Sequence, residues 1–180
     1  MNTFSVEEAV LMLNRTPAVL KTFLQHLPDS WISQNEGPDT WSPYDVIGHL
    51  IHGERTDWIP RLNKMLFDED KRFIAFDRTA MFNDSKGKSL NQLLDEFQTL
   101  RAQNVRRLEE INLSREDLNK KGIHPEFGEV NVQQLLSTWV VHDLSHIVQI
   151  SRVMARQFDT HVGPWKSYLG VLNSENNEES

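Results

Sequence analysis

Apolar residues recur along this chain with the spacing of amphipathic helices, not with the alternation of β-strands. Four segments carry this pattern. Each begins with a short polar side chain that is followed three residues later by an acid or an amide, the arrangement of a helix capping box. The four pairs are Ser5 with Glu8, Ser42 with Asp45, Ser89 with Gln92, and Asn131 with Gln134.

These caps predict four long helices, and prolines modify two of them. We expect Pro17 to bend or restart the first helix after Thr16, and Pro60 to disturb the second, because proline cannot donate to the helical ladder. A short helical piece opened by Ser114 and ending at Gly122 is expected before the last long helix. The predicted ranges are about 5–27, from 43 onward, about 89–111 and about 131–157.

The order of these elements predicts an all-α fold. Strand-like alternation is confined to a few residues of IHPEFGEV, 123–130. One long connection, 67–88, indicates a four-helix bundle with a crossover and not a simple up-and-down arrangement. We expect a single domain over 1–172 and a polar tail, NSENNEES, over 173–180.

Composition and charge exclude several classes of protein. The 180 residues are 38% hydrophobic and 25% charged, and no uncharged stretch approaches the roughly 20 residues of a membrane span. A net charge of −7 would repel nucleic acid. The acidic N-terminal segment MNTFSVEEAV does not resemble an export signal. We therefore expect a cytoplasmic protein that binds neither nucleic acid nor membrane.

The complete lack of cysteine limits the chemistry that the chain can perform alone. It has no thiolate ligand and no thiol nucleophile, so sulfur chemistry would need an added ligand.

The stretch HDLSH places His142 and His146 one helical turn apart in the last predicted helix. At about 100° per residue both lie at the flank of its apolar face, and two imidazoles at this spacing reach one metal ion. Paired histidines of a core or surface are the alternative. The apolar face consists of Leu135, Leu136, Trp139, Val140, Ile147, Ile150, Val153 and Met154.

A third ligand is needed, because catalytic metal sites usually have three protein ligands and one open position. Spacing alone does not support His49, which shares a polar strip with Asp45, His52 and Thr56, away from the apolar face of its helix. The candidates that remain open at this point are His49, His52, His124, His26 and His161.

The segments WSPYDVIGHLIHGE and VNVQQLLSTWVVHDLSHIVQISRVMA resemble the DinB-like family, and in particular its YfiT-like branch of metal-dependent enzymes. FDRTAMF, HPEFGEV and VGPWKSYL are similar too, so the resemblance covers most of the chain. It implies a four-helix bundle in which His49, His142 and His146 bind one divalent ion. The resemblance does not identify the ion, and imidazole ligands suit Zn, Ni, Mn or Fe.

Residues near these histidines have other expected roles. We expect His52 to support the ligands or to contact substrate, and His124 to cap the turn beside Pro125. Asp143 points about 100° away from His142 and is expected to orient a ligand or to be solvated.

Two reactions of a small-molecule substrate follow from the resemblance. One is transfer of a low-molecular-weight thiol that the ion activates, which suits a chain without cysteine. The other is hydrolysis by a water molecule activated on the ion, with His52 or Glu54 as general base. A protease of the H-E-x-x-H type is disfavoured, because Asp143 replaces the glutamate. A non-catalytic metal-binding module of a stress response is the third possibility, and we expect a homodimer.

Overall fold

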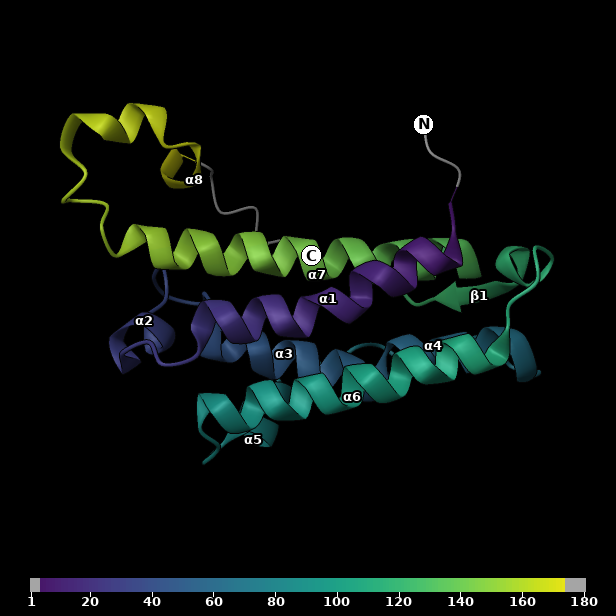
Figure 1. The fold of residues 1–180 in the computed structure, drawn as a ribbon. Coiled ribbons are helices and arrows are strands. Elements are labelled where there is room, and N and C mark those ends of the chain that lie inside the picture. Colours follow the sequence, from purple (N-terminus) through teal and green to yellow (C-terminus); the bar gives the residue numbers. More distant parts are fainter. Residues whose placement is uncertain (1–3, 174–180) are drawn as a thin grey trace.

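The computed structural model describes residues 4–173 and confirms the all-α four-helix bundle, with one small hairpin added (Figure 1). The four members of the bundle are α1, α6, α7 and the consecutive pair α3 and α4, which together form one member. Each member packs against the next, with α3 against both α6 and α7, and α1 against both α6 and α7. The bounds are α1 Val6–Leu24, α3 Pro43–Thr56, α4 Trp58–Phe67, α6 Leu90–Ile111 and α7 Val132–Arg156.

The predicted caps begin the four long helices. Three of them begin with a complete capping box, at Ser42, Ser89 and Asn131. In each, the side chain of the capping residue accepts the backbone N–H of the residue three positions later, and the side chain of that later residue accepts the backbone N–H of the capping residue. Ser5 accepts the N–H of Glu8 at 3.1 Å without the return bond. Local sequence therefore determines where these helices begin.

The two prolines act differently from each other. Pro17 does not interrupt α1, which continues to Leu24. A proline at this position leaves the carbonyl of Leu13 without its helical donor, and Nη1 of Arg101 donates to that oxygen at 3.0 Å instead. The break between α3 and α4 is confirmed but falls at Asp57, three residues before Pro60.

The strand prediction was too narrow. β1, Lys121–His124, and β2, Gly128–Asn131, form an antiparallel hairpin whose β1 is also bridged to Arg72. Gly122 permits close packing, since a Cβ there would meet the ring of Phe73 at 2.5 Å. The piece opened by Ser114 is shorter than predicted: it is a 3₁₀ helix, Asp117–Asn119, and Gly122 lies in β1 instead. Oγ of Ser114 accepts the N–H of Asp117 at 3.2 Å.

Short helices that the spacing did not predict complete the structure. They are too brief to show a helical period. Those in the connections are α2, Asp29–Ser33, and α5, Ala80–Ser85, which packs on α3 within the predicted crossover. After α7 follow a 3₁₀ helix, Gly163–Tyr168, and α8, Gly170–Asn173. Most of the predicted tail, from 174 on, lies outside the described residues.

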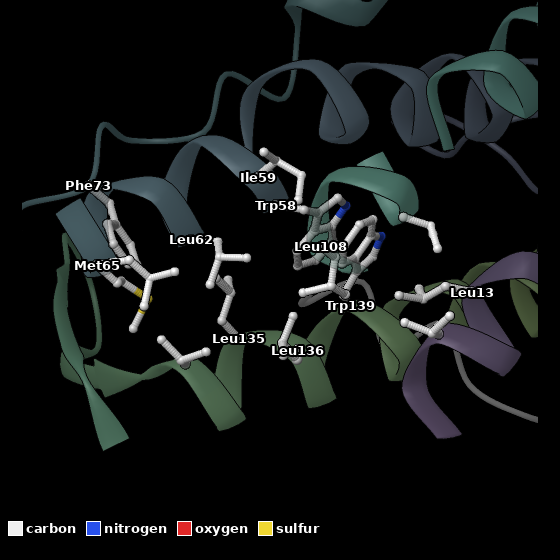
Figure 2. Packing of buried hydrophobic residues seen from close by; sticks show 14 residues of the cluster. Leu13, Trp58, Ile59, Leu62, Met65, Phe73, Leu108, Leu135, Leu136 and Trp139 are labelled. Carbon is white, nitrogen blue, oxygen red and sulfur yellow. The ribbon is translucent and has the colours of Figure 1, made fainter. Parts of the chain in front are cut away.

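The core has two apolar clusters, and the side chain of Arg101 contacts both. In the first cluster Trp58 and Trp139 stack at 5.6 Å between ring centroids (Figure 2). The second surrounds Phe97. The guanidinium carbon of Arg101 lies 4.9 Å from the Phe97 ring centroid and 5.2 Å from that of Trp139, so Arg101 touches both clusters. No helix among residues 4–173 is long and apolar enough to span a membrane.

Candidate metal centre

Three imidazoles converge where α3 passes α7. Nε2 of His142 lies 3.1 Å from Nε2 of His49 and 3.1 Å from Nε2 of His146. The three ligand atoms lie within 4.8 Å of one another, and no carboxylate belongs to this group in the described part of the chain. A metal–nitrogen bond of about 2.0–2.1 Å holds neighbouring ligand nitrogens about 3.0–3.4 Å apart, so the two 3.1 Å spacings at His142 fit one ion.

The hydrogens that the three neutral rings can carry favour a cation between their Nε2 atoms. Nδ1 of His146 lies 2.7 Å from Oε1 of Gln149, a carbonyl oxygen that can only accept. Nδ1 therefore carries the hydrogen, and Nε2 of His146 has a lone pair. Nε2 of His142 has two imidazole neighbours and at most one hydrogen when neutral, so it serves only one of them with a direct hydrogen bond. A cation accepts all three lone pairs at once.

Burial keeps these imidazoles neutral, the form that binds metals. Desolvation, with smaller contributions from the charges of His146, His52 and Arg78, lowers the pKa of His49 to about 3. Desolvation also lowers the pKa of His142 and of His146. Nδ1 of His49 and of His142 are buried without a hydrogen-bond partner among the described residues. Little proton competition for the ligands is therefore expected near neutral pH.

His49 is buried although spacing alone did not support it as a ligand, and the packing of α3 explains why. Every residue from 46 to 54 is buried, because α3 is covered by α5, α6 and α7 as well as by α4. An apolar face is therefore not the only buried face of this helix. Gly48 marks the close packing of the polar side of α3 on α5. A Cβ at Gly48 would meet Oγ of Ser85 at 2.4 Å.

A cleft opens beside the imidazoles. Its volume is about 490 Å³, and His146 and Trp41 line it together with exposed residues of α7. The ring centroid of Trp41 lies 4.7 Å from that of His49 and 6.3 Å from that of His146. A molecule in the cleft would therefore meet the His146 side of the cluster, while the indole shields the imidazoles.

A second polar cluster, the ionic cluster Glu54–Arg101–Asp143, lies deeper between the same helices. All five N–H groups of Arg101 have acceptors. Nε and Nη2 donate to Oε1 of Glu54 at 3.0 and 2.8 Å, and Nη1 and Nη2 donate to the carboxylate of Asp143 at 2.5 and 2.9 Å. The fifth donates to the Leu13 carbonyl. The carboxylates outweigh burial and raise the pKa of Arg101.

Arg101 was not among the residues predicted from the sequence, although its position among apolar residues indicates a buried charge. Buried positions of α6 recur at helical spacing, and Arg101 stands among them as the one charged member. A charge on an apolar stripe needs a buried partner of opposite sign, which here means two carboxylates. The set is Leu90, Leu93, Leu94, Phe97, Arg101, Val105 and Leu108.

Of the two candidate bases, Glu54 is already engaged by hydrogen bonds and, within the described part of the chain, His52 is not. Oε1 of Glu54 also accepts from Nε1 of Trp139 at 3.1 Å, and Oε2 accepts from Nδ2 of Asn104 at 2.9 Å. This geometry gives a general-base role of Glu54 no support. His52 is buried, with Nδ1 3.6 Å from Oδ2 of Asp84, and its role stays a prediction.

The remaining candidates do not reach the cluster. Nδ1 of His124 accepts the N–H groups of Glu126 and Phe127 at 3.2 and 3.3 Å, which confirms the turn role. Asp143 is neither a ligand nor solvated, because it is buried against Arg101. His26 follows α1, and His161 lies beyond α7 beside Phe158.

Known proteins match the fold of this chain. A model of the DinB superfamily matches residues 12–150. YfiT from Bacillus subtilis, described as a probable metal-dependent hydrolase with an unusual four-helix bundle topology, is similar with a TM-score of 0.71 and 20% identity, over 91% of this chain and 92% of that one. A DinB-like protein from Bacillus cereus is similar with a TM-score of 0.57 and 18% identity, over 84% and 92%. No curated protein matches.

Proposed function

The chain belongs to the DinB superfamily, and on this premise we propose that it is a metal-dependent enzyme whose divalent ion is held by His49, His142 and His146. The observation that carries the proposal is the meeting of three Nε2 atoms, two pairs of them at 3.1 Å. The ligand set is neutral, so a bound ion keeps its full charge and lowers the pKa of a water or thiol bound to it.

We propose transfer of a low-molecular-weight thiol onto an electrophile as the reaction. The chain has no cysteine, so the nucleophilic sulfur must come from a small molecule. In the transfer the sulfur forms a bond to the electrophilic carbon, the leaving group departs with the bonding electron pair, and the thiol proton passes to solvent. Glu54 is engaged by Arg101, Trp139 and Asn104, and this transfer does not require it as a base.

Hydrolysis is the second candidate, favoured by the description of YfiT. It would need a group that takes a proton from water. Glu54 is engaged, Asp39 is the one carboxylate among the described residues that line the cleft, and His52 would then have to serve as the base. We therefore rank hydrolysis below thiol transfer.

Loading the protein with Co²⁺ separates these reactions. Sulfur ligation of Co²⁺ gives an intense near-ultraviolet charge-transfer band that nitrogen and oxygen ligands do not give. For a transferase we expect this band on adding cysteine or glutathione, and conjugation of the thiol to a chromogenic aryl halide. His49→Ala should abolish both signals, and the exposed His161→Ala, a matched control, should leave both unchanged.

Other outcomes contradict thiol transfer in distinct ways. Cleavage of a nitrophenyl ester without thiol, with competitive inhibition by the thiol, would assign hydrolysis instead. Metal binding with neither a thiol band nor turnover of thiols, esters or amides would leave a non-catalytic metal-binding module.

A further inference from the structure

The wall of the cleft on α7 is apolar although it faces solvent. Val141, Leu144 and Val148 line it, and their exposed fractions are 58%, 43% and 61%. Their spacing places them on one side of α7, and Trp41 faces the same cleft. A ligand with an apolar body could cover these side chains while it lies beside His146.

Two arginines line the cleft, and they differ in whether they pair with a carboxylate. Arg152 lines the cleft, but Nε and Nη2 donate to the carboxylate of Glu36 at 2.7 to 3.0 Å. Arg78 also lines it, and within residues 4–173 its guanidinium makes no ion pair. The adjacent acid, Asp77, makes no ion pair with Arg78 among the described residues, and its Oδ1 accepts from the backbone and hydroxyl of Thr79 at 2.8 and 2.7 Å.

We propose that the site takes a small molecule with an apolar body and one anionic group, of which a carboxylate is the best fit, and that Arg78 binds the anion. The inference rests on the proposed function, because the reacting end of the molecule must reach the metal ligands through His146. Arg78 would act as a specificity-determining residue, and Val141, Leu144 and Val148 would carry the apolar body.

Size and charge support this ligand class. A cleft of about 490 Å³ falls within the range of small-molecule sites. The planar guanidinium matches a carboxylate with two parallel hydrogen bonds. Asp39 also lines the cleft and would repel an anion, so the guanidinium is the feature that could select one. A chain of net charge −7 offers anions few such places.

A matched pair of ligands tests the charge. We would measure binding of 4-phenylbutanoate and of its neutral amide by calorimetry, to metal-loaded and to chelated protein. The wild type should bind the carboxylate about tenfold more tightly, because the amide lacks the charge-assisted bonds. Arg78→Gln should bring the ratio close to one, while Arg115→Gln, which removes an exposed arginine of the loop after α6, should keep it.

A separate substitution, Val148→Ser, tests the apolar wall of the cleft. Val148→Ser should weaken both ligands by a similar factor of about three, because it removes apolar surface and no charge. An unchanged carboxylate preference in Arg78→Gln, or equal binding of both ligands by the wild type, would overturn the proposal. Absence of metal from the wild type would overturn the proposed function alone, because the chelated arm still reports on Arg78.

Discussion

Two polar clusters lie between α3 and α7, a few residues apart, and they differ in how well their atoms are satisfied. In the ionic cluster every donor of Arg101 has an acceptor, and Glu54 accepts from three side chains. In the histidine cluster Nδ1 of His49 and His142 have no partner among the described residues, and three nitrogens crowd together. The ionic cluster is complete within the protein, whereas the three Nε2 atoms of the histidine cluster form a group that could hold a metal ion.

The contrast shows how the same two helices can carry one cluster that fixes the fold and another that is positioned to bind a ligand. A buried charge is tolerated only when it is paired and fully hydrogen-bonded, so the ionic cluster fixes how α1, α3, α6 and α7 lie. That fixed frame holds the imidazoles close together before any ion binds. Nδ1 of His49 and of His142 makes no hydrogen bond to the described residues, so these two rings need contribute little to folding.

The largest expected effect comes from breaking the complete cluster. Arg101→Met would leave the carboxylates of Glu54 and Asp143 buried without a counter-charge, so the free energy of unfolding should fall by about 3–5 kcal/mol. Denaturant unfolding of chelated protein measures this. Arg106→Met, at an exposed position of the same helix, is the control and should change stability by less than about 0.5 kcal/mol. A loss below about 1 kcal/mol for Arg101→Met would show that the ionic cluster is not the frame.

A smaller effect is expected from the incomplete cluster. In chelated protein His142→Ala should cost about 1 kcal/mol or less. The substitution removes a polar atom that has no partner, and loses ring packing against Trp58 at 5.1 Å between centroids. The same unfolding assay in chelator measures it. A cost equal to that of Arg101→Met would place the histidines among the residues that hold the fold.

The smallest effect concerns a third cluster, Glu36 with Arg152 and Arg156, at the rim of the cleft. Burial opposes ionisation of Glu36, but hydrogen bonds and charge of the two arginines outweigh it and lower the pKa of the carboxyl below its usual 4.5. The stability that this carboxylate gives is present above 4.5 and is lost as pH falls through the lowered pKa.

Unfolding of Glu36→Gln across pH checks this sign. The variant should be less stable than the wild type near neutral pH, and the difference should shrink as the pH falls below about 4.5. A difference that is constant over this range would mean that Glu36 acts through packing and not through its charge.

The sequence predicts those parts of the structure that local chemistry determines. Capping residues set the starts of the long helices, and HDLSH puts His142 and His146 on one side of α7. Long-range packing determines the rest. His49 is buried because other helices cover α3, and only the resemblance to a family could name it. The Leu13 carbonyl that Pro17 frees meets Arg101 from a helix far along the chain, and no local pattern shows that pairing.

Metal content tests the central claim most directly. Purified protein, loaded with excess Zn²⁺ or Ni²⁺ and freed of unbound ion, should retain about one ion per chain by elemental analysis. His146→Ala and His49→Ala should each retain far less, because two neutral imidazoles hold an ion poorly. His161→Ala should match the wild type. Equal metal content in the wild type and in both ligand variants would contradict the account, and so would a wild type that retains no ion.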